Sequence, residues 1–133
     1  MANGTIAFDT LSTSGQIDGV ARSIDTDYLL NGSAKCWINY DATASSDYTR
    51  DSFNVASTTD NGTGSHDIAF SNNMINNFHA GVTNGHRDDN QSISVLQGDG
   101  ALTTGFRFKL NAFSSGTNTD SDSAFGAIFG ELA

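Results

Sequence analysis

Short runs of alternating apolar and polar residues dominate this chain, and the stretch DSFNVASTTDNGTGSHDIAF (residues 51–70) shows the pattern most fully. Phe53 and Val55 alternate with polar neighbours at its start, and Ile68 and Phe70 do so at its end. Alternation with a period of two is typical of half-buried β-strands. Residues 60–64 (DNGTG) lie between the runs and supply the Asn and Gly that favour a tight reversal. The stretch therefore predicts a β-hairpin.

The same alternation recurs along the rest of the chain from residue 34 onward. AKCWINY (34–40) places Cys36, Ile38 and Tyr40 on one face and Trp37 on the other. With the two strands of the hairpin, we expect seven strands; the remaining four are FHAGV (78–82), QSISVLQ (91–97), FRFKL (106–110) and AFGAIFG (124–130). The clearest core faces are expected on the last two strands, with Phe106, Phe108 and Leu110 inward on one and Phe125, Ala127 and Phe129 inward on the other.

The number and spacing of these strands predict the fold class. No long amphipathic helix is present to connect parallel strands, and SNNMINNF (71–78) would form at most one helical turn because Asn disfavours helix interiors. Short strands separated by turns predict an all-β chain folded as an antiparallel β-sandwich or jelly-roll-like knob. A chain of 133 residues fits one such domain.

Residues 1–33 differ from the rest of the chain. Their apolar residues, among them Ile6, Phe8 and Leu11, are sparse and follow no sustained helical or strand period. A segment of this kind cannot bury itself, so it is often either frayed or laid against a neighbouring subunit. We expect residues 1–33 to form an extended N-terminal arm for attachment and oligomerisation, and residues 34–133 to form the knob.

The small number of core-forming residues predicts association between copies. Leu, Ile, Val and Phe account for 28 of the 133 residues, about 21%, which is just above the share at which chains stay disordered. Trp37 falls on the polar side of its strand, where it would either stack on a sugar or be buried against a second protein surface. Burial is the interpretation we prefer, and the candidate subunit-interface residues are Trp37, Ile6, Phe8 and Leu11.

Charge and cysteine content exclude several classes of partner. Six basic residues stand against fifteen acidic ones, for a net charge of −9, so nucleic-acid binding is not expected. Cys36 is the only cysteine, which excludes an internal disulfide and a CxxC zinc or redox site, and its place among core residues predicts a small buried hydrophobe. The sequence shows neither a secretory signal nor a membrane-spanning run, so we expect synthesis in the cytoplasm and no membrane insertion.

Acidic pairs and histidines are the remaining candidates for chemistry. Asp25/Asp27, Asp88/Asp89 and Asp120/Asp122 could suggest calcium or a carboxylate dyad, but each pair lies in a turn-rich segment and no calcium-binding loop is present. The three histidines lack metal-site spacing. We therefore expect no enzymatic activity, no catalytic or metal-binding residue and no cofactor.

One polar cluster is a candidate recognition loop. GHRDDN (85–90) combines His86, Arg87, Asp88 and Asp89, and loops carry binding groups on rigid scaffolds. Arg87 could hold a sugar hydroxyl or a carboxylate, although an internal salt bridge would explain the same residues equally well. The polar segment 115–123 is a second candidate.

Four segments of the chain carry a family resemblance: GTIAFDTLSTSGQI (4–17), GSAKCWINYD (32–41), RDSFNVASTTDNGTG (50–64) and FGELA (129–133). They resemble tail-fibre-like virion structural proteins of tailed bacteriophages, a group common among marine and cyanobacterial phages. The chain departs from that group at Cys36, where a small residue such as Ala is usual, and at SHDIAF (65–70), which is less β-branched.

The resemblance implies a non-enzymatic virion protein made in the host cytoplasm. Its partners would be its own copies in a homotrimer, other virion proteins, and a host-surface glycan or protein contacted by a tail fibre or fibre tip. Two alternatives stay open: a capsid decoration protein of the cement or head-fibre type, and a carbohydrate-binding module.

Overall fold

The computed structural model describes residues 10–12, 23–44, 48–86, 92–96 and 102–133. The chain divides into two compact units, Met1–Ser33 and Ala34–Ala133. In the first unit β1 (Thr10–Ser12) pairs antiparallel with β2 (Ser23–Asp25), and α1 (Thr26–Gly32) follows β2 directly. These short elements lie in the segment whose sequence shows no sustained helical or strand period. The helix has only seven residues, too few for a 3.6-residue period to be recognised.

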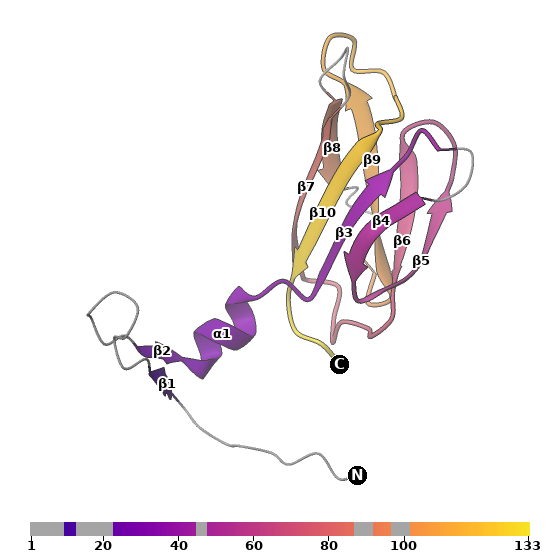
Figure 1. The fold of residues 1–133 in the computed structure, drawn as a ribbon. Coiled ribbons are helices and arrows are strands. Elements are labelled where there is room, and N and C mark those ends of the chain that lie inside the picture. Colours follow the sequence, from indigo (N-terminus) through magenta and orange to yellow (C-terminus); the bar gives the residue numbers. More distant parts are fainter. Residues whose placement is uncertain (1–9, 13–22, 45–47, 87–91, 97–101) are drawn as a thin grey trace. The chain divides into compact units, whose positions relative to one another are not determined.

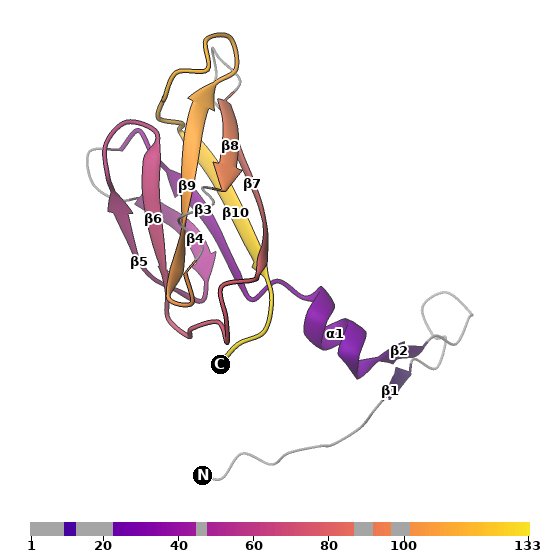
Figure 2. The same cartoon turned by 180° about the vertical axis from the view of Figure 1, so that it is seen from behind.

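The second unit contains two antiparallel sheets packed face to face, which confirms the all-β sandwich. One sheet, in the order β4-β3-β10-β7, faces the viewer in Figure 1, and the other, β5-β6-β9-β8, faces the viewer in Figure 2. The described strands of this unit are β3 (Cys36–Asp41), β4 (Tyr48–Phe53), β5 (Val55–Asp60), β6 (Ser65–Phe70), β7 (Ala80–His86), β8 (Ser92–Leu96), β9 (Gly105–Ala112) and β10 (Ser123–Phe129).

The core lies between the two sheets and follows the predicted alternation on β3 and β9. Cys36, Ile38 and Tyr40 are buried on β3, and Phe106 and Leu110 are buried on β9. The side chain of Phe108 lies outside the described residues. Burial of such side chains removes apolar surface from water and supplies most of the stability of the fold.

The predicted core face of β10 is wrong by one residue. Ala124, Gly126 and Ile128 are buried, whereas Phe125 is 43% exposed. A Cβ atom added at Gly126 would lie 3.2 Å from the Phe106 ring, so the ring of the opposite sheet occupies the space that a larger side chain would need. The small residues therefore point inward and Phe125 points outward, against the simple expectation that the bulkier set is buried.

The β5–β6 hairpin confirms the predicted reversal, but its first strand begins only at Val55. The turn is formed by residues 61–64, with positive φ at Gly62 and Gly64. Asn54 also has a positive φ, 58°, and breaks the run 51–55 into two strands. As a result β4 belongs to one sheet and β5 to the other, which raises the number of strands in this unit above the seven expected.

The side chain of Asn54 stabilises the corner at which the chain passes from one sheet to the other. Its side-chain nitrogen donates to the carbonyl oxygens of Lys35 and Asn72, both at 3.0 Å, and its side-chain oxygen accepts from the Asn72 backbone N–H at 2.7 Å. Asn tolerates the left-handed conformation better than most residues with a side chain. One residue thus supplies both the backbone conformation and the hydrogen bonds of the crossing.

The segment between β6 and β7 carries no helix within residues 71–79, and β7 begins at Ala80 rather than at Phe78. The backbone N–H of Phe78 donates to the side chain of Asn76, and the Phe78 side chain is 89% exposed. Such a local turn ends the extended pattern that the sequence predicts for Phe78.

Replacing Asn54 by Ala should destabilise the sandwich by about 2–4 kcal/mol, because it removes the side-chain hydrogen bonds of Asn54 and places a Cβ-bearing residue without a local partner in the left-handed region. Asn54→Gly should cost about 1 kcal/mol less, since Gly adopts that conformation freely. Denaturant unfolding of the three proteins checks this. Equal costs for both variants would show that backbone conformation contributes nothing at this corner.

Candidate functional site

The outer side of the β4-β3-β10-β7 sheet carries a row of apolar side chains, one from each strand. Trp37 on β3 pairs with Phe53 on β4 and with Ala127 on β10, and Ala127 pairs with Val82 on β7. Phe125 lies in the adjoining row of the same side. The exposed fractions are 52% for Phe53, 37% for Trp37, 62% for Val82 and 43% for Phe125. We call these five residues the apolar face.

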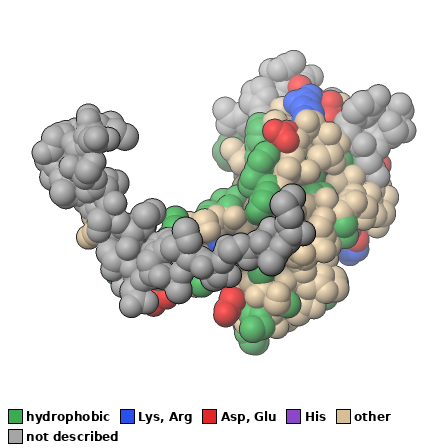
Figure 3. Space-filling view, turned by 60° about the horizontal axis from the view of Figure 1, so that its bottom comes forward, with side chains coloured by type: hydrophobic (Ala, Val, Ile, Leu, Met, Phe, Trp, Pro, Cys, Tyr) green, Lys and Arg blue, Asp and Glu red, His purple; other side chains and the backbone are tan. Residues whose placement is uncertain are grey.

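A hollow of about 440 Å³ lies within the apolar face. Trp37, Val82 and Phe125 line it, with the small side chain of Ala127 between the strands of Trp37 and Val82. The hollow exists because Ala127 is the smallest residue of its row. Hydrophobic side chains are gathered visibly on the exposed surface of the sandwich in Figure 3.

The polar residues beside the hollow are few. Asn39 and Asn84 flank Phe125 in the second row, and Asp51 on β4 pairs with Asn39. The side-chain oxygen of Asn39 is buried and has no hydrogen-bond partner. A buried acceptor without a donor costs free energy. This atom is covered by its own chain, so a partner on the face does not reach it directly.

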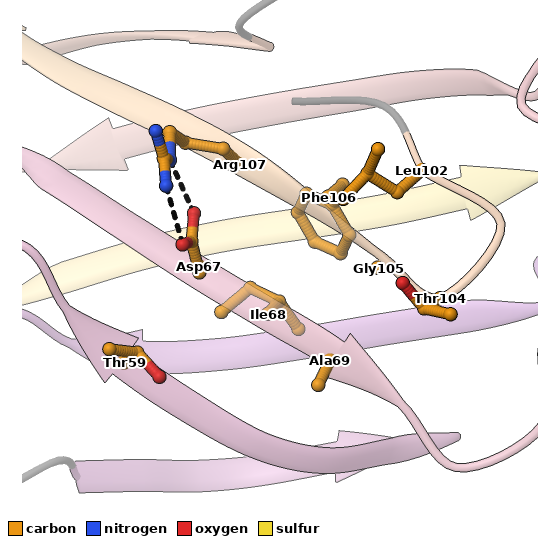
Figure 4. A pocket seen from close by; sticks show the side chains of 9 residues that line it. All are labelled: Thr59, Asp67, Ile68, Ala69, Leu102, Thr104, Gly105, Phe106 and Arg107. Atoms are coloured by element: carbon orange, nitrogen blue, oxygen red, sulfur yellow. Dashed lines mark hydrogen bonds and ion pairs between the residues drawn. The ribbon is translucent and has the colours of Figure 1, made fainter. Parts of the chain in front are cut away.

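The outer side of the other sheet is polar on β5, β6 and β9, the strands of this sheet for which side chains are described. Thr59, Asp67 and Arg107 form one row across β5, β6 and β9, with Lys109 further along β9. Arg107 binds Asp67 through two nitrogens, and the Nη2 to Oδ2 distance is 2.6 Å (Figure 4). The hydrogen bond from the Arg107 guanidinium lowers the pKa of Asp67 below its usual value. This is the ordinary solvent-facing surface of an antiparallel sheet.

A smaller hollow of about 200 Å³ adjoins this ion pair, as Figure 4 shows. The hollow exists because Ala69 and Gly105 have little or no side chain there. A Cβ at Gly105 would lie 2.3 Å from the Ile68 carbonyl oxygen, so close packing of β6 and β9 requires glycine at this position. Its shape follows from strand packing, and Arg107 is already engaged by Asp67.

The difference between the two outer sides identifies the candidate site. Across the described residues, twelve large hydrophobic side chains are exposed, as many as the hydrophobic residues that are buried. Single exposed hydrophobic residues are normal, but a contiguous set aligned across four strands marks an interaction surface. Because the polar side shows what this chain places toward water, the apolar face is the surface that a partner would cover.

A buried histidine cluster lies inside the sandwich. His66 is fully buried; its Nδ1 lies 3.4 Å from the Tyr40 hydroxyl and 3.9 Å from Asp60, and its Nε2 lies 3.5 Å from Asp120. Tyr40 and Asp120 are far from His66 in the chain, so only the inward position of His66 on its strand could be read from the sequence. The side chains of Asp60 and Asp120 are 55% and 34% exposed, whereas the imidazole itself is fully covered.

Cys36 is fully buried, as predicted for a small core hydrophobe. Burial raises the pKa of its thiol to about 12. The nucleophilic form of cysteine is the thiolate, so this thiol is inert at neutral pH.

The structure brings only part of the sequence-predicted site together. Trp37 lies in the apolar face, and Leu11 lies in β1 of the other unit, while Ile6 and Phe8 are outside the described residues. His86 ends β7, where its backbone pairs with Ser123, and Arg87, Asp88 and Asp89 are outside the described residues.

Sequence reasoning missed Phe53, Val82 and Phe125 as neighbours of Trp37. The outward position of Trp37 was readable from the alternation of its strand. Its neighbours were not, because they follow from strand order and register, which join segments far apart in the chain.

Within the described ranges, no three His, Cys, Asp or Glu side chains come together in a way that could hold a metal ion. No helix in this part of the chain is long and apolar enough to cross a membrane. Comparison with family models, with curated proteins and with solved structures found no match. The candidate function therefore depends on the geometry of the sandwich and on the sequence resemblance.

Replacing Asp67 by Asn should lower the stability by less than about 1 kcal/mol at neutral pH, because the ion pair is partly exposed. The folded-state pKa of Asp67 is lowered, so the pair stabilises the fold above the ordinary Asp pKa of about 3.9. This contribution is lost as the pH falls through the lowered pKa. The difference between wild type and Asp67→Asn should vanish below it.

Unfolding curves over a range of pH measure this difference, with Glu131→Gln as the matched control at an exposed carboxylate. A difference that grows as the pH falls would contradict the assignment.

Proposed function

We propose that this chain is a non-enzymatic structural protein that assembles into a homotrimer and serves as a tail fibre or fibre tip of a tailed bacteriophage virion. The observation that carries the self-assembly is the apolar face, whose exposed aromatic residues have no cover within the described part of their own unit. The resemblance of the sequence to tail-fibre-like virion proteins supports the virion setting. In this role the sandwich is a rigid building block.

The composition of the apolar face favours a protein partner over a sugar. Carbohydrate sites combine an aromatic platform with several polar groups that orient the hydroxyls. Trp37 and Phe125 would provide the platform, and the two Asn residues that line the hollow favour this second candidate. However, Phe53 and Val82 extend the apolar surface beyond any polar group that a sugar would need, as in the core of a subunit interface.

A capsid decoration protein would use the same kind of interface. Tail and head positions differ in how many copies a particle carries, so counting copies in purified virions separates the two. Both assignments predict the same behaviour for the isolated protein, because each requires copies to associate.

At micromolar concentration the purified chain should have about three times the 14.0 kDa mass of one copy in light scattering. Val82→Ser should weaken association at least about tenfold, since a side chain that is 62% exposed in the isolated unit would lose its burial in the interface.

The matched control is Leu102→Ser, which removes another exposed hydrophobic side chain, 55% exposed, beside the smaller hollow. It should leave the association unchanged. A stable wild-type monomer at this concentration would refute the proposed assembly, and equal weakening by both variants would remove the assignment to the apolar face.

Host recognition is expected on loops at the end of the sandwich opposite the start of β3, where the segment between β9 and β10 lies (Figure 1). Replacing His86, Arg87, Asp88 and Asp89 together by Ser should leave the trimer intact and reduce adsorption of phage to host cells. The measurement is adsorption of particles that carry the variant. Unchanged adsorption by intact particles would favour the capsid decoration role instead.

A further inference from the structure

We infer that three copies turn their apolar faces toward a common axis running along the strands, so that β4 of each copy meets β7 of the next. This arrangement rests on the proposed trimer and adds which surfaces meet. The occupant of the apolar face is then another copy of the same chain. Four features of the face support this choice.

The first feature is charge. The chain carries a net charge of −9, so copies repel one another over most of their surface. In the two rows that contain the apolar face, Asp51 is the only charged residue, and it lies on the edge strand β4. The centre of the face, on β3 and β10, is neutral. It is therefore a surface through which two acidic copies can approach.

The second feature is the pairing of the two edges. Phe53 on β4 and Val82 on β7 belong to the same row, and Asp51 and Asn84 belong to the next row. Rotation about an axis parallel to the strands does not change the position of a residue along that axis. Phe53 of one copy then meets Val82 of the next, and Asp51 meets Asn84.

The third feature is that these edge contacts are complementary. Asn84 uses its side-chain oxygen to accept the Gly85 N–H at 2.9 Å, which leaves its amide N–H groups to donate outward. Asp51 is a pure acceptor when ionised. A two-fold axis across the strands would instead place Asp51 opposite Asp51, and like charges directly opposite each other are destabilising.

The fourth feature is the hollow beside Ala127. It lies on the two central strands, where three faces that surround an axis would converge. Exposed aromatic side chains of neighbouring copies would fill it. The contact between copies would thus remove the hollow.

Thiol cross-linking tests the arrangement directly. The double variant Phe53→Cys/Val82→Cys should give covalent trimers with a short bismaleimide cross-linker, because each copy would present one thiol to each neighbour. Either single variant should stay uncross-linked. The native Cys36 is fully buried, so wild type is a suitable blank. Products are counted on denaturing gels.

Cross-linking in either single variant, or products that stop at dimers, would overturn the three-fold arrangement. Light scattering of the same samples before cross-linking separates this failure from failure of the proposed function. A trimer that does not cross-link would contradict only the placement of β4 against β7. A monomeric wild type would refute the trimer itself.

A double-mutant cycle on Asn84 and Asp51 provides a second test that leaves the aromatic residues unchanged. Asn84→Asp should weaken the trimer at least about tenfold by placing a carboxylate opposite Asp51 of the next copy. Adding Asp51→Asn should restore association. Within one copy these residues are three strand spacings apart, about 14 Å, too far for strong coupling through water. Strictly additive effects would contradict the contact.

Discussion

The packing of Phe106 over Gly126 determines which side chains the sandwich presents to its surroundings. The Phe106 ring lies where a side chain at Gly126 would be, so β10 turns Ala124, Gly126 and Ile128 inward. Because side chains alternate along a strand, Phe125 and Ala127 must then face outward. A slip of one residue would bury Phe125 and expose Ile128, and it would also force Phe106 out of its place. The apolar face is thus a consequence of the core.

The two outer sides of the sandwich differ in chemistry although both sheets have four strands. One side is polar on β5, β6 and β9 and carries a cross-strand ion pair, and the other carries aromatic residues around a hollow. Burying such a face between copies would compensate for a core that the composition makes small. The same reasoning explains how a chain in which we expect no catalytic residues can have a defined role. Its function would lie in the shape and chemistry of a surface.

Sequence patterns predicted the sandwich class, the hairpin and the inward residues of β3 and β9, because local alternation and turn residues determine these features. They failed on β10, where the choice between two alternating sets depended on the Phe106 ring of another strand. They also failed at Asn54, whose left-handed conformation is set by hydrogen bonds to Lys35 and Asn72. The neighbours of Trp37 could not be predicted from the sequence, because they depend on the register of four strands. In each failure the deciding contact joins segments distant in sequence.

Burial of the apolar face between copies can be measured most directly through Trp37, since it is the only tryptophan and lies within that face. Its fluorescence can be followed with acrylamide as a quencher while the protein is diluted from assembling to dissociating concentrations. If the apolar face is buried between copies, the emission of the assembled protein should be blue-shifted and poorly quenched. It should become red-shifted and readily quenched as the copies separate. Emission that stays equally quenchable in the assembled and the dissociated protein would contradict burial of the apolar face between copies.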